Sequence, residues 1–415
     1  MTGDDIFQAI DKHDLDHLAR LLAKGADPSY QEPEYQCPAL IFAIEEMRDG
    51  GPDEAVALLL RYGARPMNAL ITAALDDNLS AAHLLIAAGA DPNARDDEGY
   101  SPLRSATEMR SLAMVAALLR SGANRTIDDS GGPTGMSALG WAAHHLDLAM
   151  VKLLLAWGAD PILDDVDYMI PRGHLPKRDE TNAEVWDQIA ALLPMRRAHG
   201  EGPPSVPIPL APPVTRDQLG TELLASIDRH DLDALAHLLA AGADPNTRDS
   251  NSSCPALIEA IEEVADGGPL EAVALLLRYG ARPGHSLITA AWNDNLETAL
   301  LLLAGGTDPG LEDDKGYSPL RVAVERKNLA MAATLLRSGA DKTIDSAGGP
   351  LGASALGRAV LELDLPMVKL LLAWGADPLL PDVDRMIARD HLRKREAANA
   401  QIWDEIAALL PPRSA

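Results

Sequence analysis

Apolar residues recur along this chain at intervals of three and four, in short stretches that each end at a glycine. Val151 and Leu154 illustrate the spacing, which places their side chains on one face of a helix. Gly158 follows at once, and glycine closes a helix because it adopts the left-handed conformation without steric cost. Asp160-Pro161 then predicts a turn, because proline cannot continue the helix. The pattern predicts short helices separated by tight turns.

The same ending, Leu-Leu-x-x-Gly-Ala-Asp with variations, marks a repeated unit. It closes at Gly25, Gly63, Gly89, Gly122 and Gly158, and again at Gly242, Gly280, Gly306, Gly339 and Gly375. Upstream of the Gly158 ending, residues 137–139 open another predicted helix, in which Ala142 and Ala143 allow close packing. Each unit is therefore expected to hold two short helices and an extended finger. Such short helices are marginal alone, so the units must stack to bury their apolar faces.

The second half of the chain repeats the first. A shift of 217 residues aligns the halves without a gap, and roughly two thirds of positions from Asp4 to Pro194 are identical. The sequence predicts one block at 1–198 and a second at 217–415, each with its own C-terminal sealing helix. Residues 199–216 contain six prolines, which favour an extended linker that spans at most about 50 Å.

The units resemble ankyrin repeats. Residues 97–124 are similar to the family pattern D-x-x-G-x-T-P-L-H followed by L-L-x-x-G-A-D, with Ser101 in place of the family threonine and Arg104 in place of the histidine. Other units keep the second helix and the Gly-Ala turn but lose the T-P-L-H box, as at 37–40. The resemblance covers about nine tenths of the chain. It implies an all-α ankyrin-repeat solenoid of helix-turn-helix units with extended fingers, arranged in two blocks.

Two features depart from a regular repeat. Successive unit-closing glycines are 38, 26, 33 and 36 residues apart in both copies, against a family period near 33. The long interval predicts a lengthened turn around Gly50-Gly51-Pro52, between the helices of the second unit. The short interval predicts that the finger before the third unit is almost absent.

A different segment ends each copy. Residues 181–194 predict a helix with a capping box made by Thr181 and Glu184, and with Val185, Trp186, Ile189, Leu192 and Leu193 on one apolar face. An open solenoid needs such a helix to cover its last unit. The helix belongs to residues 161–194, which fit no repeat unit, and residues 378–411 repeat that whole segment in the second copy. A ligand platform built on Trp186 and Trp403 is the alternative interpretation.

Charge narrows the possible partners. Acidic residues outnumber basic ones 62 to 36, which gives a formal net charge of −26. Such a chain repels nucleic acid and anionic lipid and attracts basic partners. No apolar run approaches eighteen residues, and the first residues are acidic where a secretory signal would be basic and then apolar. We therefore expect a cytoplasmic protein with no membrane and no nucleic-acid partner.

Few residues suggest chemistry. Asp165, Asp167 and His174 are close in sequence and could be imagined as an acid–base or metal site, but no nucleophile or oxyanion pattern accompanies them. We expect no catalysis, no metal and no cofactor. A metal-dependent enzyme that uses this segment remains an alternative function, and a purely structural scaffold is another.

The resemblance implies where a partner binds. In ankyrin-repeat proteins the partner usually contacts the finger tips and the exposed end of each first helix. By position these sites are Tyr30, Tyr35, Glu45, Glu46, Leu75, Asp76, Asp97, Glu98, Tyr100, Glu108, Met109, His144, His145, Glu262, Glu263, Trp292, Tyr317, Glu325, Arg326 and Leu361. They form an acidic stripe with interleaved aromatic and methionine side chains, which suits a basic protein partner. The expected function is a non-catalytic interaction module, and the resemblance to bacterial immunity proteins implies toxin or effector neutralisation as a role.

The copies differ mainly at these exposed positions. Leu75 corresponds to Trp292, Met109 to Arg326, and His144 to Leu361. Large side chains carry most of the energy of an interface, so moving them should change the partner surface. The alternatives are neutral drift at exposed sites and a duplication that supplies only avidity.

Overall fold

The computed structural model describes residues 4–32, 37–131, 134–195, 218–249, 253–348 and 352–412. Within these ranges the chain is helical, and extended pairing is limited to three isolated bridges at the fingers, Gln31 with Pro38, Ser130 with Ser137 and Arg248 with Pro255. The all-α expectation is confirmed.

Each copy forms five helix pairs in this described part. The first copy contains α1 (Asp4–Asp11), α2 (Leu15–Ala23), α3 (Ala39–Arg48), α4 (Asp53–Arg61), α5 (Ala69–Leu75), α6 (Leu79–Ala87), α7 (Pro102–Glu108), α8 (Leu112–Arg120), α9 (Ala138–His144) and α10 (Leu148–Ala156). A 3-10 turn at Pro171–His174 and the closing helix α11 (Ala183–Leu192) follow.

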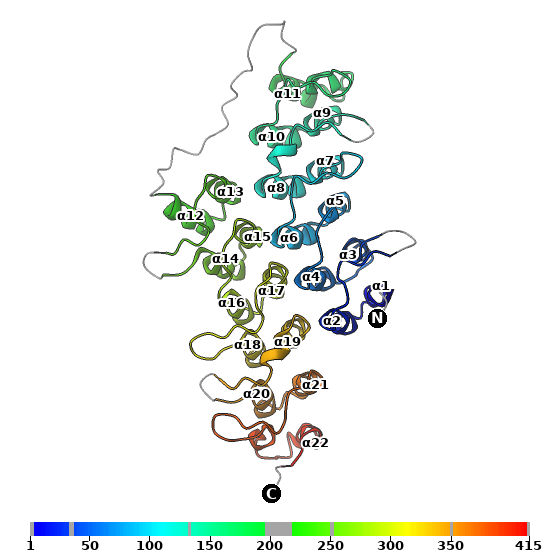
Figure 1. Ribbon diagram of the computed structural model, residues 1–415. Helices are drawn as coiled ribbons and strands as arrows, with labels where there is room; N and C mark the ends of the chain where they lie inside the picture. Colours follow the sequence, from blue (N-terminus) through cyan, green and yellow to red (C-terminus); the bar gives the residue numbers. More distant parts are fainter. Residues whose placement is uncertain are drawn as a thin grey trace.

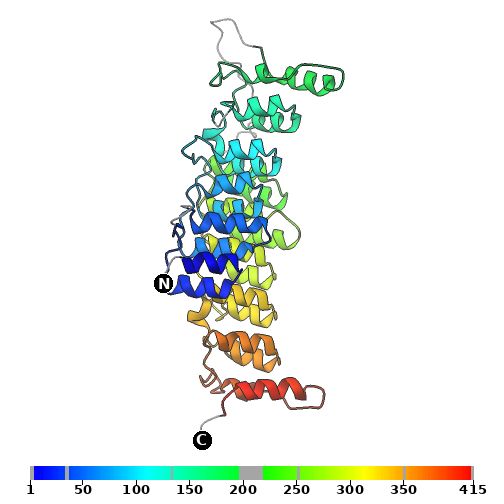
Figure 2. The same ribbon diagram turned by 90° about the vertical axis from the view of Figure 1, so that its right-hand side faces the viewer.

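The second copy repeats the arrangement. Its pairs are α12 (Leu219–Asp228), α13 (Leu232–Ala240), α14 (Ala256–Ala265), α15 (Glu271–Arg278), α16 (Ser286–Trp292), α17 (Leu296–Ala304), α18 (Pro319–Glu325), α19 (Leu329–Arg337), α20 (Ala355–Leu361) and α21 (Leu365–Ala373), closed by a 3-10 turn at Ala388–His391 and by α22 (Ala400–Leu409). Figure 2 shows the helices stacked across one long axis.

Local sequence explains where the second helices begin and end. Asp14, Asn78 and Asp147 each accept the backbone N–H three residues ahead, which satisfies a free donor of the first turn. Gly122 closes α8 with a φ of 98°, a left-handed conformation that favours glycine. Leu59, Leu85 and similar residues on these helices are fully buried, and the second helices supply more of the core than the first helices do.

The structure explains the unusually long and short intervals between unit-closing glycines, and only one of them has wholly the cause that the sequence predicted. The extra residues of the second unit lengthen its first helix to 10 residues, against 7 in α5. The turn that follows, 49–52, is only slightly longer than its counterpart at 76–78. The turn is lengthened as predicted, but by one residue only, and most of the extra residues extend α3 instead. The short finger before the third unit is confirmed, since residues 62–68 separate α4 from α5 whereas 88–101 separate α6 from α7.

The closing helix seals the stack, but its predicted cap is wrong. Asn182 is the residue before α11 and makes no side-chain cap bond, while Thr181 Oγ1 donates to Asp179 at 2.7 Å. Ile189 and Leu193 are fully buried, whereas Leu192 is 40% exposed and does not belong to the buried face. The Trp186 indole N–H donates to the carbonyl of Pro176 at 2.9 Å, which holds the preceding loop.

The two copies dock on each other through their second helices. α4 packs on α17, α6 packs on α15 and α17, and the outer pairs are α2 with α19 and α8 with α13. The stacks run antiparallel, so that α11 and α22 lie at opposite ends of the molecule (Figure 1). The first helices of both copies point outwards, to opposite sides. The sequence indicated two blocks but gave no indication of this docking.

Candidate protein-binding surfaces

The predicted partner residues lie where the resemblance implied, at the ends of the first helices and on the fingers. Every one of them within the described residues is at least partly exposed, and Tyr35 lies outside those residues. Glu45 and Glu46 lie near the end of α3, Glu108 ends α7, and Glu325 ends α18. The carbonyl end of a helix carries partial negative charge, so acidic residues there work against helix stability. We call the outward sides formed by the first helices and fingers the first-helix faces.

Several of these carboxylates already have partners. Glu46 lies 3.7 Å from the His13 imidazole, and Asp76 is paired with Arg48. Glu108 lies 2.8 Å from the guanidinium of Arg104, which is only 1% exposed. Part of the acidic stripe therefore stabilises the fold, and Glu108 is the clearest case.

Arg104 occupies the family histidine position and connects two units. Its Nε donates to the carbonyl of Met136 at 3.0 Å and its Nη2 donates to Thr134 Oγ1 at 3.0 Å. Its guanidinium also lies 4.9 Å from the centre of the Trp141 ring. In the second copy Arg358 replaces Trp141, and Glu362, 3.5 Å away, offsets its charge.

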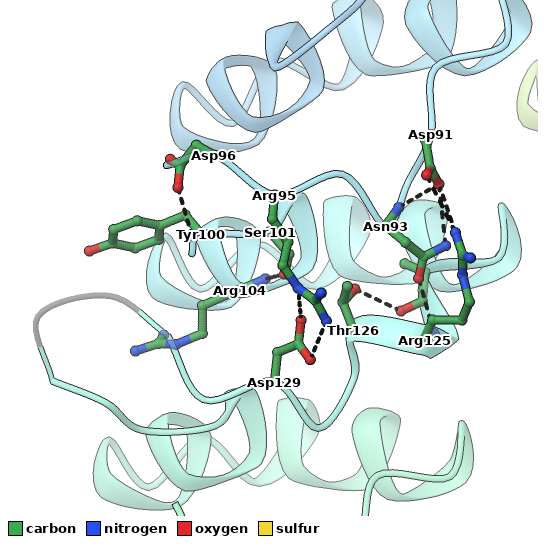
Figure 3. Close-up of polar contacts among 11 residues, drawn as sticks. Asp91, Asn93, Arg95, Asp96, Tyr100, Ser101, Arg104, Arg125, Thr126 and Asp129 are labelled. Carbon is green, nitrogen blue, oxygen red and sulfur yellow. Dashed lines mark hydrogen bonds and ion pairs between the residues drawn. The ribbon is translucent and has the colours of Figure 1, made fainter. Parts of the chain in front are cut away.

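The aspartates of the fingers mostly shape the backbone. Asp96 Oδ1 accepts the Tyr100 N–H at 2.8 Å, and Arg95 bridges to Asp129 at 2.6 Å (Figure 3). Asn93 joins neighbouring fingers, since its Oδ1 accepts the Arg125 N–H at 3.0 Å. These bonds hold the fingers in place. Asp97 and Glu98 are exposed at the tip between them.

An aromatic cluster on the first copy was missed by the sequence analysis. Phe42 of α3 lies 5.1 Å from the ring of Phe7 on α1, and Tyr30 lies 6.1 Å from Phe7. All three side chains are only partly buried. Phe42 is three and four residues from Glu45 and Glu46, so the cluster and the two acids share one side of α3.

The corresponding place on the second copy is acidic. Glu259 occupies the position of Phe42, and burial together with Asp228, Asp249 and other nearby acids raises its pKa to about 7. Its Oε2 accepts no hydrogen bond from the described residues. The second copy places its aromatic pair elsewhere, with Trp292 lying 5.5 Å from Tyr317. The two first-helix faces therefore differ in chemistry as well as in direction.

Of the residues considered for chemistry, only two come together. His174 Nε2 lies 2.5 Å from Asp165 Oδ2, and both side chains are buried. Asp165 Oδ1 accepts the backbone N–H groups of Asp167 and Met169, while the residue Asp167 itself is exposed. The pair therefore folds the loop that precedes α11. The second copy repeats it at 2.6 Å between His391 and Asp382.

Within the described ranges, no group of three or more His, Cys, Asp or Glu side chains is placed to hold a metal ion. No helix there combines the length and the apolar character that a membrane crossing needs.

Comparison with known proteins matches this architecture. Residues 70–165 and 287–382 match the family model described as ankyrin repeats (3 copies). A putative ankyrin repeat-containing protein of Treponema pallidum (strain Nichols) is 35% identical over 113 residues, which cover 25% of this chain and 36% of the relative. The match thus spans about a third of the relative's length.

Two solved structures match this chain at low identity and with TM-scores below 0.5. The human ASB11 ankyrin repeat domain is 18% identical, with 67% of this chain and 100% of that chain covered and a TM-score of 0.38. The structure of the Bd0816 predatory endopeptidase from Bdellovibrio bacteriovorus in complex with immunity protein Bd3460 matches at 22% identity, 45% and 97% coverage and a TM-score of 0.37. The family match falls at equivalent positions of both copies and on stacked helix pairs, so residues 70–165 and 287–382 are ankyrin repeats.

Proposed function

We propose that this protein is a non-catalytic module that binds a basic protein on its first-helix faces. Ankyrin repeats indicate a protein–protein interaction module. The observation that carries the choice of a basic partner is the placement of acidic residues at the carbonyl ends of first helices. Glu45 and Glu262 are exposed there, and the helix itself gains nothing from them. A net charge of −26 adds long-range attraction for a basic protein.

The two faces support two separate binding surfaces. They point to opposite sides of the docked molecule, so a partner on one face does not reach the other (Figure 1). Tyr30 and Phe42 offer an aromatic contact on the first copy, whereas Trp292 and Tyr317 offer one on the second. Under this proposal a basic toxin or effector is the first partner class to test, because neutralising one requires tight binding and no catalysis.

The test combines capture with charge reversal on the full chain. Immobilised protein is exposed to a cell extract at low salt, and bound proteins are identified by mass spectrometry. We expect basic proteins to be captured and to be lost when Glu45, Glu46, Glu262 and Glu263 are changed to Lys. The matched control changes Glu180 and Glu184 to Lys, because both are exposed but lie at the closing helix. Equal capture by all three proteins would reject the acidic faces as the binding surface.

The enzyme alternative has its own test. Asp165 and His174 hold each other in a buried pair. Titration calorimetry of the full chain with Mg²⁺ or Mn²⁺ at millimolar concentration decides whether the segment binds metal. Heat that disappears in the Asp165→Asn variant would support the alternative.

A further inference from the structure

Matching ion pairs connect the two copies. Arg120, at the end of α8, lies 2.7 Å from Asp233 on α13 and 3.1 Å from Glu271 at the start of α15. Arg337, its counterpart in the second copy, lies 2.6 Å from Asp16 and 3.1 Å from Glu54 of the first copy, the counterparts of those two acids. Both arginine side chains are 18% exposed. At these ion pairs, equivalent residues of the two copies therefore make equivalent contacts across the docking.

The helix packing has the same symmetry. α4 packs on α17 as α15 packs on α6, and α2 packs on α19 as α13 packs on α8. Each arginine lies at a helix carbonyl end, and Glu54 and Glu271 lie in first helical turns, where the opposite partial charges are favourable. A twofold arrangement in which one surface meets its own equivalent is the geometry of a symmetric homodimer.

At the centre of the docking, several facing residues differ between the two copies. A cavity of about 330 Å³ lies there, lined by Asp53, Leu79, Ser80, His83, Leu84, Leu270, Glu297, Leu300 and Leu301. Asp53 corresponds to Leu270, Ser80 to Glu297 and His83 to Leu300, while Leu84 and Leu301 are alike. Another difference lies outside this cavity, where His237 stacks on Trp157 of the first copy, while the counterpart of His237 is Arg20. The residues of both ion-pair sets are the same in the two copies.

We infer that each copy carries a self-complementary docking surface whose partner is a second copy of the same block, bound in cis in this chain and able to bind in trans. Arg120, Asp16 and Glu54 all belong to the first copy, so two first copies can form both ion-pair sets. The same holds for Arg337, Asp233 and Glu271, which all belong to the second copy. The linker then only raises the local concentration of one block near the other, to about 1 mM by the usual estimate for flexible linkers.

The first experiment removes the covalent connection. A protease site is placed within residues 199–216 of the full chain, and the folded protein is cut. We expect the two fragments to travel together in size-exclusion chromatography with light scattering, at the mass of the intact chain. Before the cut, the linker holds the two halves at an effective concentration of about 1 mM. After the cut, they meet only at the protein concentration of the experiment, about 10 µM, so co-migration requires a real interface. Separation of the wild-type fragments would overturn the inference.

Charge reversal identifies the surface. The cut Arg120→Glu/Arg337→Glu protein should dissociate at least about 100-fold more readily, because four attractive pairs become repulsive. Arg95→Glu is the control, since Arg95 pairs with Asp129 of its own copy. Adding Asp233→Arg and Glu271→Arg to Arg120→Glu should restore pairing, which separates an interface effect from misfolding. An unchanged dissociation constant in the reversed protein would contradict the proposed surface.

The second experiment tests self-pairing. Full-length chains with either of two N-terminal tags are cut, mixed and captured on the first tag. We expect the second tag to be recovered, because first copies from different chains pair with each other. Uncut chains, whose surfaces are occupied in cis, serve as the control. Recovery of the second copy alone, without the second tag, would show that pairing requires two different blocks and would refute self-complementarity.

Discussion

At the residue scale, a buried charged side chain, Arg104, connects two neighbouring repeat units. Arg104 replaces the family histidine and reaches both the next finger and the Trp141 ring. The sequence identified the substitution but not its contacts, because a spacing pattern does not show which residue of the next unit a long side chain meets. Glu259 was missed for the same reason, since helical periodicity does not distinguish a half-buried acid from an exposed one.

The Arg104→Leu variant should be less stable than wild type by on the order of 2 kcal/mol, because Glu108 and the Met136 carbonyl lose a charged partner. Urea unfolding of the full chain measures the change. Arg95→Leu is the comparison, since its pair with Asp129 is exposed and worth less than about 1 kcal/mol. Equal losses from the two variants would count against a structural role for Arg104.

Glu259 should make stability depend on pH near neutrality. Its pKa of about 7 is above the ordinary value, so the folded state binds more protons than the unfolded state between the two values. Stability is therefore greatest below the ordinary pKa and falls as pH rises through 7. Glu259→Gln should stabilise the protein at pH 8 and have little effect at pH 5, as measured by urea midpoints. Glu184→Gln, an exposed residue of α11, should show no such difference.

At the scale of elements, the sequence predicted most of what was found. Five helix pairs and a closing helix per copy follow from glycine spacing and apolar periodicity, and both are present in the described residues. The cap of α11 was predicted wrongly because Asp179 takes the Thr181 hydroxyl. The clamp on the end of the second closing helix was also missed: Arg389 Nη1 donates to the Ala407 carbonyl at 2.6 Å, which satisfies an otherwise free acceptor.

The buried face of α11 can be tested directly. Ile189→Ala should lower stability by about 2 to 4 kcal/mol, because Ile189 is fully buried against the last unit. Leu192→Ala should change it by less than about 0.5 kcal/mol, since Leu192 is 40% exposed. Thermal unfolding of the two variants provides the measurement. A larger loss of stability from Leu192→Ala than from Ile189→Ala would show that Leu192 does belong to the buried face of α11, as the sequence predicted.

At the scale of the whole molecule, the docking of the copies could not be predicted from sequence. Leu84 and Leu301 lie at the docking centre, yet their spacing is the same as that of residues buried inside a single stack. The Arg120 and Arg337 pairs join residues far apart in the chain, and no local pattern relates them. The direction of the first-helix faces follows from this docking, so it was equally inaccessible.

The independent folding of residues 1–198 and 217–415 stays a prediction. Each block stacks its own helix pairs and ends in its own closing helix, so each should unfold cooperatively when produced alone. Each should also be less stable alone than in the chain, because docking buries part of its second-helix surface. Calorimetry of both blocks and of the full chain makes the comparison. A block that is unfolded on its own would contradict the division into two domains.

The two faces should also differ in affinity for any captured partner, by at least about tenfold, or about 1.4 kcal/mol. The aromatic contacts lie at different places on the two copies, and such contacts carry most interface energy. Full chains with Lys at 45 and 46, or at 262 and 263, leave one face intact for titration. Equal affinities would show that the duplication supplies avidity alone.

The side-by-side docking also bears on elasticity. A repeat protein that consists of one stack of units bends easily, because each unit contacts only the units before and after it. Here α4, α6, α15 and α17 brace one row against the other, so flexing one row would require shearing its neighbour. The curvature of each first-helix face is therefore fixed before a partner arrives. Under the function proposed above, such a rigid face loses little conformational freedom on binding, so it selects a partner by shape and not by wrapping its repeats around it.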